Sequence, residues 1–386
     1  MTLINDTNSL AAFCKPLHDT EFITVDTEFM REKTYWPELC LVQIAGPNAF
    51  VAIDPLAENI DLEPLFKLLG DDSVTKVFHA ARQDLEIFFH LMNDMPKKIF
   101  DTQIAAMVCG FGESVGYDQL IAKLTKVQID KGPRFTDWSV RPLTERQINY
   151  ALADVTHLRS AYKKLLARLD KDQRHSWIEE EMAILTAPTT YLIDPMKAYE
   201  KIKARGGKAR VLSVLRELAA SRELEARRRN VPRNRIIRDE ILVEISHHLP
   251  STTDALARSR GLGNKTANGP YGKQILKAVN RGLNLPRPEW PRVPPRRDLP
   301  QGIGPIADLL TVLLKKVTEE THVAGRLIAK TSDIELIAGL GEEADVLALT
   351  GWRRKIFGLD ALKLRAGEIS LAIDGNRLIT KDHSAD

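Results

Sequence analysis

The spacing of apolar and polar positions changes along this chain of 386 residues. Near the N-terminus, short apolar runs rich in β-branched and aromatic residues are separated by Gly, Pro and Asn, which predicts three antiparallel strands. Helical periodicity then alternates with one further strand. This order predicts a mixed sheet with helices on its faces. The expected strands are 22–29, 39–45, 50–53 and 74–78, and the expected helices are 62–69, 85–92, 102–109 and 144–169.

Beyond residue 170 the strand signals fade and helical periodicity dominates. A proline-dense segment separates two helical sets, and proline at such density stiffens a linker. The expected helices of this half are 171–186, 195–204, 208–226, 236–248, 252–258 and 270–282. The expected division is an α/β domain at 1–170, a helical connector at 171–207, an all-α domain at 208–290, a linker at 291–302 and a second all-α domain at 303–375.

Four acidic residues and one tyrosine occupy positions that regular elements would bring to one point. Asp26 and Glu28 lie two apart in a strand and so share a face. Tyr150 and Asp154 lie four apart on a helix, which also gives them one face. Asp84 follows a short strand at the start of a helix. Taken singly, each pair is typical of a solvated strand edge or of helix packing, and only their combination indicates a metal site.

Carboxylate oxygens are the ligands that hard cations such as Mg²⁺ prefer. Four of them could hold two ions and leave positions for water and phosphate, the arrangement used for in-line displacement at phosphorus. A tyrosine beside such a site could orient the attacking water or help to remove its proton.

Segments around these five residues resemble the exonuclease motifs of the DEDD superfamily in its ribonuclease D form. The third motif is similar to the variant that has tyrosine in place of histidine. The resembling segments are Val25–Phe29 with Tyr35–Ile44, His79–Glu86, and Trp138–Leu143 with Tyr150–Asp154.

This resemblance implies a ribonuclease-H-like fold for residues 1–170. It implies that Asp26, Glu28, Asp84 and Asp154 bind two Mg²⁺ or Mn²⁺ ions, and that Tyr150 orients the water. The implied reaction is 3′-to-5′ hydrolysis of RNA that has a free 3′ end, with release of nucleoside 5′-monophosphates. The implied substrates are tRNA precursors.

The helical half resembles the helicase-and-RNase-D C-terminal (HRDC) domain. The resemblance rests on Leu215–Leu218, Ala226–Arg235 and Arg238–Glu240 within residues 209–280. Residues 303–372 resemble a second, more diverged copy.

Charge is distributed unevenly, although the whole chain carries only +3. Residues 1–170 have a net charge of −6, whereas residues 201–300 have a net charge of +14. An acidic catalytic part joined to a strongly basic part suits recruitment of a polyanion. The alternative is a solvated basic helix face around Arg227–Arg229.

Three residues before the third motif are candidates for substrate binding. Arg134 and Arg141 could contact phosphates, and Trp138 could stack on a terminal base or pack against the motif helix. Two other polar residues are given structural roles: Asp101 is expected to cap the following helix, and His79 to form a hydrogen bond at a strand end.

Composition is that of an ordinary globular protein. The N-terminus shows no secretory signal and no apolar run is long enough to span a bilayer. Three widely spaced cysteines fit neither a disulfide framework nor a zinc pattern. We therefore expect a cytoplasmic protein with reduced thiols that does not bind membranes and acts as a monomer.

Two other functions fit parts of the pattern. One is a DNA proofreading or repair exonuclease with the same carboxylates. The other is a nucleic-acid-binding adaptor whose exonuclease domain is inactive. The complete set of five residues disfavours the adaptor, and RNA is distinguished from DNA by contacts to the ribose 2′-hydroxyl.

Overall fold

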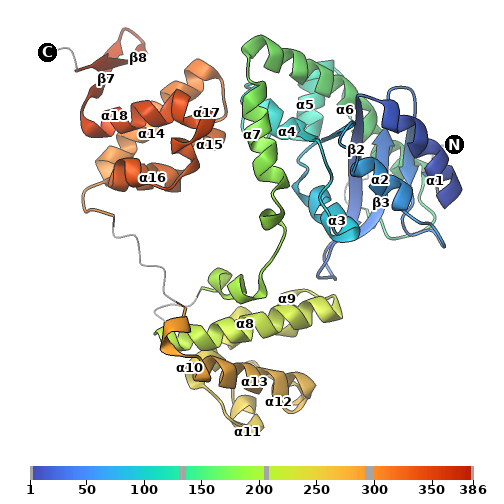
Figure 1. The fold of residues 1–386 in the computed structure, drawn as a ribbon, viewed down its shortest axis with the longest axis vertical. Coiled ribbons are helices and arrows are strands. Elements are labelled where there is room, and N and C mark those ends of the chain that lie inside the picture. Colours follow the sequence, from blue (N-terminus) through green and yellow to red (C-terminus); the bar gives the residue numbers. More distant parts are fainter. Residues whose placement is uncertain (1–2, 130–131, 133–135, 204–207, 292–298, 384–386) are drawn as a thin grey trace. The chain divides into compact units, whose positions relative to one another are not determined.

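The computed structural model describes residues 3–129, 132, 136–203, 208–291 and 299–383 (Figure 1). The chain divides into two compact units, and β2 (Phe22–Met30) runs from the first into the second. The first unit contains Met1–Glu28, Cys40–Ala187 and Asp298–Asp386, and the second contains Phe29–Leu39 and Pro188–Arg297.

None of the helices within the described ranges is both long and apolar enough to cross a membrane.

A six-stranded sheet in the order β1-β4-β3-β2-β5-β6 organises the N-terminal part of the chain. Strands β3 and β4 pair antiparallel, whereas β1–β4, β2–β5 and β5–β6 pair parallel, which confirms the predicted mixed sheet. Two strands were not expected, because runs of two and three residues are too short to show periodicity. The strands are β1 (Leu3–Ile4), β2 (Phe22–Met30), β3 (Glu38–Ala45), β4 (Phe50–Ile53), β5 (Thr75–Phe78) and β6 (Ile99–Asp101).

Helices of the first unit surround this sheet. The long helix α6 begins after Thr144, whose side chain accepts a hydrogen bond from the Gln147 amide in a capping box, so its predicted start is confirmed. Asp101 caps α4 as predicted, by accepting from the amide of Gln103. The helices are α1 (Thr7–Cys14), α2 (Glu63–Leu69), α3 (Arg82–Met92), α4 (Thr102–Val108), α5 (Tyr117–Thr125), α6 (Glu145–Asp172) and α7 (His175–Thr186).

The second unit contains a helical domain with its own apolar core. Helices α8 and α13 pack closely, since a Cβ atom on Gly282 would lie 2.5 Å from the Cα atom of Val214. The Ser213 hydroxyl donates to the Gly282 carbonyl at 2.8 Å and fixes this crossing. The elements are η4 (Pro195–Lys201), α8 (Ala209–Arg229), α9 (Arg233–Ile236), α10 (Asp239–His248), α11 (Thr253–Ala257), α12 (Asn264–Asn268) and α13 (Pro270–Asn284).

The C-terminal domain belongs to the first unit and is anchored to α7. The indole rings of Trp177 and Trp352 stack with their centroids 4.6 Å apart. Glu181, which is 6% exposed, forms an ion pair with Arg353 at 2.6 Å. The helices are α14 (Gly304–Thr321), α15 (Gly325–Ile328), α16 (Thr331–Leu340), α17 (Gly351–Arg353) and α18 (Leu359–Ala366), with a π-helical segment at Arg354–Gly358 before α18.

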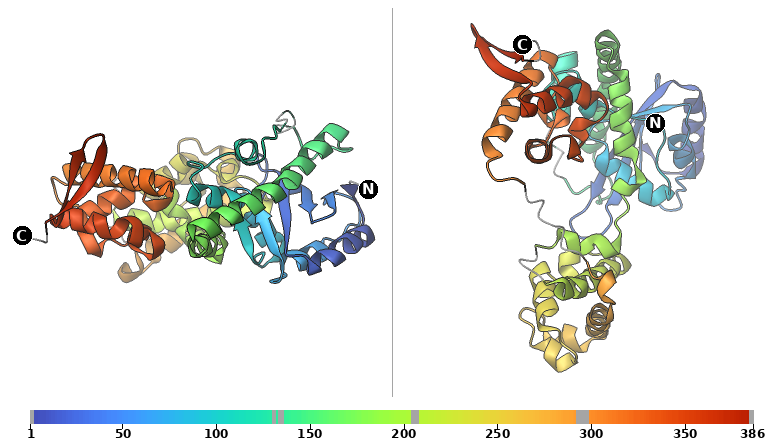
Figure 2. Two further views of the ribbon diagram at one scale, coloured as in Figure 1. Left: turned by 90° about the horizontal axis from the view of Figure 1, so that it is seen from above. Right: turned by 60° about the vertical axis from the view of Figure 1, so that its left-hand side comes forward.

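The prediction that residues 303–375 are all-α is wrong at their end. Strands β7 (Ile369–Asp374) and β8 (Arg377–Asp382) form an antiparallel hairpin, which Figure 2 shows projecting from the helices of this domain. Gly375 at the turn has a φ of +57°, a conformation that glycine adopts without strain. Much of the predicted linker at 291–302 lies outside the described residues.

Candidate active site

Strand β2 and helix α6 are joined by a buried hydrogen bond. The Thr24 hydroxyl, on the third residue of β2, donates to the Val155 carbonyl of α6 at 2.8 Å and lies 3.3 Å from the Ala45 carbonyl of β3. Asp26 lies two residues after Thr24, and Asp154 lies one residue before Val155. The contact therefore sets the position of Asp26 relative to Asp154.

Asp26 lies among the other three predicted carboxylates. Its pKa is raised well above the usual value, first by burial and then by the negative charges of Asp154, Asp84 and Glu28. Charges perturb a pKa in this way only over a short range, so the four side chains from β2, α3 and α6 converge. The Asp26 side chain stays partly exposed, so it is accessible to a ligand.

Asp84 lies in the first turn of α3 and is 6% exposed. Its carboxylate accepts a hydrogen bond from the Thr27 hydroxyl of β2, and burial raises its pKa to about 7. The turn before it is held by Asp101, whose carboxylate accepts from the amides of Ala80 at 3.0 Å and Ala81 at 2.8 Å. Asp101 thus caps α4 and also fixes the turn from which α3 starts.

Tyr150 lies on α6 beside a pocket of about 450 Å³. Its ring lies 6.2 Å from the ring of Trp138, centroid to centroid. Trp138 is 2% exposed, so the structure favours packing against the motif helix over stacking on a base. Polar side chains line much of the pocket, among them Gln128, Asn149 and His157.

Arg141 holds the loop before α6. Its Nε and Nη2 atoms donate to the two oxygens of Asp54 at 2.7 and 2.6 Å. Its remaining hydrogen bonds go to the carbonyls of Cys40, Trp138 and Val140. The guanidinium is therefore committed to protein acceptors rather than available to phosphate. The other candidate arginine, Arg134, lies outside the described residues.

The donor set of this site consists of oxygens, as a hard cation requires. Across the residues that the structure describes, no group of three or more His, Cys, Asp or Glu side chains is placed so that it could hold a metal ion. The repulsion that raises the pKa of Asp26 is nevertheless the kind that a divalent cation relieves. The oxygen donors of these residues therefore match the ligands that a hard metal ion prefers.

Several residues that support the site were not predicted. Thr24 and Thr27 look like ordinary strand residues, and Tyr117 like a helix-packing residue. The Tyr117 hydroxyl donates to the Ala153 carbonyl at 2.9 Å, and its pKa is raised by burial and then by the charges of Asp154 and Asp26. These roles depend on contacts distant in sequence, and no local pattern signals them.

The arginines at the end of α8 are largely paired with glutamates of the same helix. Arg227 pairs with Glu223 at 3.1 Å, and both Arg228 and Arg229 pair with Glu225, at 2.8 and 2.5 Å. Glu225 is 3% exposed. These arginines therefore contribute less free positive charge than the sequence suggests.

Comparisons with known proteins identify the family of this chain. A family model for a 3′-5′ exonuclease matches residues 1–170, and a model for the HRDC domain matches residues 211–279. Ribonuclease D of Granulibacter bethesdensis is 47% identical over 98% of this chain and 95% of its own length. The chain belongs to the ribonuclease D family. Ribonuclease D of Nitrobacter hamburgensis is 46% identical over the full length of both proteins.

The family is also evident in three dimensions. The crystal structure of Escherichia coli RNase D, an exoribonuclease involved in structured RNA processing, matches with a TM-score of 0.83 and 29% identity, over 95% of this chain and 98% of that one. The catalytic core of RRP6 from Trypanosoma brucei, at 20% identity and a TM-score of 0.53, shares the fold over 73% of this chain and 79% of its own. As a ribonuclease D, the protein is a 3′-5′ exoribonuclease, and exonucleases of this type generally depend on a divalent metal.

Proposed function

We propose that this ribonuclease D hydrolyses the 3′-terminal phosphodiester of RNA with two divalent ions, Mg²⁺ or Mn²⁺, and releases nucleoside 5′-monophosphates. Asp26, Glu28, Asp84 and Asp154 would hold the ions. The observation that carries the proposal is the proximity of Glu28, Asp84 and Asp154 to Asp26, whose pKa is raised first by burial and then by their charges. When bound, such ions stabilise both the attacking and the leaving oxygen.

The chain's own residues supply position and proton transfer. Tyr150 orients the attacking water through its hydroxyl, and Trp138 keeps the tyrosine ring in place. The Thr27 hydroxyl and the turn held by Asp101 orient the Asp84 carboxylate. The Thr24–Val155 hydrogen bond holds the strand of Asp26 and Glu28 against the helix of Asp154 before substrate arrives, which lowers the cost of ordering the site.

We further propose that the natural substrates are RNAs with a free 3′ end, among them tRNA precursors, and that residues 303–375 form a diverged HRDC domain. Support comes from family membership, from the basic middle of the chain and from the helices α14 to α18. Cys14, Cys40 and Cys109 are buried and take part in no disulfide within the described residues, which suits a reducing compartment such as the cytoplasm. We propose that the enzyme acts there as a monomer.

Substitution of the carboxylates tests this mechanism. Asp26→Ala and Asp154→Asn should each abolish Mg²⁺-dependent release of mononucleotides from RNA labelled at its 3′ end. Binding of the same RNA in the presence of EDTA should persist, because neither substitution removes a positive charge. Glu63→Gln, at an exposed position on α2, is the matched control and should retain full activity. Full activity in either aspartate variant would overturn the two-ion assignment.

Selectivity is tested separately with matched RNA and DNA oligonucleotides. Faster release from RNA supports recognition of the 2′-hydroxyl. Equal or faster release from DNA would favour the proofreading or repair alternative.

A further inference from the structure

The C-terminal domain contacts the end of α4, within the first unit. The Ala324 amide, just before α15, donates to the Met107 carbonyl at 3.0 Å. The Arg174 guanidinium, just before α7, donates to the Val108 carbonyl at 2.7 Å and to the Thr321 carbonyl of α14 at 2.9 Å. The last carbonyls of a helix have no partner inside the helix, so these donors attach the end of α4 to the C-terminal domain.

The connection between α4 and α5, residues 109–116, is held at two further points. The Arg326 amide of α15 donates to the Glu113 carboxylate at 3.0 Å. The Gln103 side chain of α4 donates to the carbonyl of Val115, a residue that is 5% exposed, at 3.1 Å. The α4–α5 connection therefore runs from a contact with the C-terminal domain into the core, two residues before α5 begins.

Helix α5 begins at Tyr117, which contacts α6 at the proposed metal site. The Tyr117 hydroxyl donates to the Ala153 carbonyl at 2.9 Å, and Ala153 directly precedes Asp154. The pKa of Tyr117 is raised first by burial and then by the charges of Asp154 and Asp26. Tyr117 therefore lies close to the carboxylates and supports the turn of α6 that carries one of them.

The Glu113 contact is not needed to attach the C-terminal domain. The stacked indoles of Trp177 and Trp352 and the buried pair of Glu181 with Arg353 already attach this domain to α7. A hydrogen bond at the exposed Glu113 adds little to stability, because water competes for it. Its place in the chain, four residues before Tyr117, instead suits control of where α5 begins.

We propose that the C-terminal domain positions Asp154 through the α4–α5 connection, with Glu113 and Tyr117 as positioning residues. When the Glu113 contact is lost, the start of α5 shifts and the Tyr117 hydroxyl no longer holds the Ala153 carbonyl. Asp154 then moves relative to the other carboxylates. The inference rests on the proposed function in taking Asp154 as a metal ligand, and it gives the C-terminal domain a role separate from RNA recruitment.

Calorimetric titration of the full-length protein with Mn²⁺, without RNA, tests the proposal. Tyr117→Phe removes only the hydroxyl and should weaken Mn²⁺ binding about tenfold, the lower end of the range for residues that orient metal ligands. Glu113→Ala should weaken it about fivefold, since one hydrogen bond is lost. The kcat for mononucleotide release from a dinucleotide should fall in the same order, with little change in KM.

Conservative variants separate the hydrogen bond from the charge. Glu113→Gln keeps an acceptor oxygen and should restore the wild-type Mn²⁺ affinity. Arg326→Ala should leave the affinity unchanged, because the donor to Glu113 is the backbone amide. A loss in Arg326→Ala equal to that in Glu113→Ala would assign the effect to charge and overturn the proposal.

A double variant tests whether the two residues act along one path. Glu113→Ala/Tyr117→Phe should bind Mn²⁺ as Tyr117→Phe does, within about twofold, because the contact that Glu113 supports is already lost. If the two losses multiply, the residues act independently, and the proposed path is wrong.

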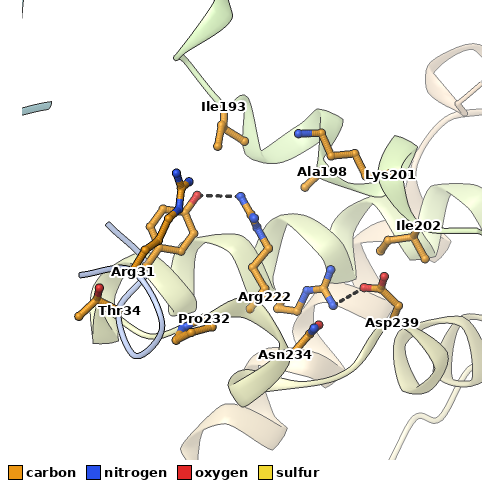
Figure 3. Close-up of a pocket in the computed structure, with 12 residues that line it drawn as sticks. Arg31, Thr34, Ile193, Ala198, Lys201, Ile202, Arg222, Pro232, Asn234 and Asp239 are labelled. Atoms are coloured by element: carbon orange, nitrogen blue, oxygen red, sulfur yellow. Dashed lines mark hydrogen bonds and ion pairs between the residues drawn. The ribbon is translucent and has the colours of Figure 1, made fainter. Parts of the chain in front are cut away.

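Asp239→Ala is the control for a general loss of stability. Asp239 lies at a pocket of about 380 Å³ in the second unit and accepts from the buried Arg222 at 2.6 Å (Figure 3). Its removal should lower the urea midpoint at least as much as Glu113→Ala does, but it should leave Mn²⁺ affinity unchanged. An equal loss of Mn²⁺ affinity in both variants would overturn the proposal, because lost stability would then explain the effect.

The same titrations distinguish this inference from the proposed function. Absence of Mn²⁺ binding in the wild type would contradict the proposed function. Normal binding in the wild type, with no loss in either Glu113→Ala or Tyr117→Phe, would contradict the positioning role alone.

Discussion

The hydroxyl of Thr24 donates a 2.8 Å hydrogen bond to the backbone carbonyl of Val155. The bond joins the strand that carries Asp26 and Glu28 to the helix that carries Tyr150 and Asp154. Thr24 is fully buried, so water does not compete for the contact. Through this bond, a residue with no chemical role in hydrolysis sets the relative position of the residues that we propose to perform it.

Replacement of Thr24 by valine tests whether its hydroxyl positions the proposed catalytic residues. Thr24→Val keeps the side-chain shape but loses the hydrogen bond, which should cost about 1 kcal/mol in the free energy of unfolding. We expect kcat to fall roughly tenfold while KM changes little, because the carboxylates are less well aligned. Thr24→Ser retains the hydroxyl and should restore most of kcat. Equal kcat in the valine variant and the wild type would show that the contact does not position the site.

Tyr150→Phe tests the role of the tyrosine hydroxyl. The ring and its packing on Trp138 are retained, so the protein should stay folded and bind Mg²⁺ as before. We expect kcat to fall by about 100-fold, within the range for loss of a group that assists proton transfer. Tyr162→Phe on the same helix is the control and should keep near-normal turnover, because its ring packs in the core against Phe22 and Phe100. An unchanged rate in Tyr150→Phe would remove this hydroxyl from the mechanism.

Glu181 and Arg353 form a buried ion pair that anchors the C-terminal domain to α7. Among the described residues, Arg353→Met would leave the buried Glu181 carboxylate with the Trp352 indole N–H as its remaining donor, at 3.1 Å. We expect a loss of about 3–5 kcal/mol in the free energy of unfolding, measured with urea. Arg354→Met breaks an exposed pair with Glu342 and should cost less than about 1 kcal/mol. Similar losses in the two variants would contradict the anchoring role of the buried pair.

The same ion pair affects how the basic region should be removed. A truncation at residue 205 would delete Arg353 and Trp352. Trp177 would then lose its stacking partner, and the Glu181 carboxylate would lose its ion-pair partner. Weakened RNA binding by such a truncation would therefore combine lost contacts with lost stability. Point substitutions in the second unit are the cleaner test of RNA recruitment.

Lys76 should make stability depend on pH. The residue is fully buried, its Nζ donates to the carbonyls of Asp71 and Val74, and burial lowers its pKa to about 8. Between pH 8 and the unfolded pKa near 10.4, the folded protein binds fewer protons than the unfolded chain. The free energy of unfolding should therefore rise with pH across this window, by up to about 3 kcal/mol. Below pH 8 the buried lysine is charged, so the full cost of burying its charge lowers the free energy of unfolding there.

Denaturation at several pH values between 7.5 and 10 measures this effect. Lys76→Met should show a flatter stability curve than the wild type over the same window. Lys98→Met, which removes an exposed lysine on the neighbouring strand connection, should leave the rise in place. A rise of equal size in Lys76→Met would assign the pH dependence to another group.

Strong local patterns made most of the fold predictable. The capping box at Thr144 and the Asp101 cap are short-range hydrogen bonds between residues within three positions, so the sequence displays them directly. Strands β2, β3 and β4 show β-branched runs between turn residues and were predicted within one residue. The C-terminal hairpin was missed because two six-residue strands follow a helical set and the hairpin is largely exposed.

The sequence by itself determined the chemistry: which carboxylates exist, that they alternate on a strand or repeat along a helix, and which family they belong to. Only the tertiary structure decided which arginines are paired with carboxylates. Arg141 pairs with Asp54, and Arg227 pairs with Glu223. The physical reason is that the partner of a charged side chain can lie anywhere in the folded chain. The composition gives the number of charged residues but does not show which of them are in contact.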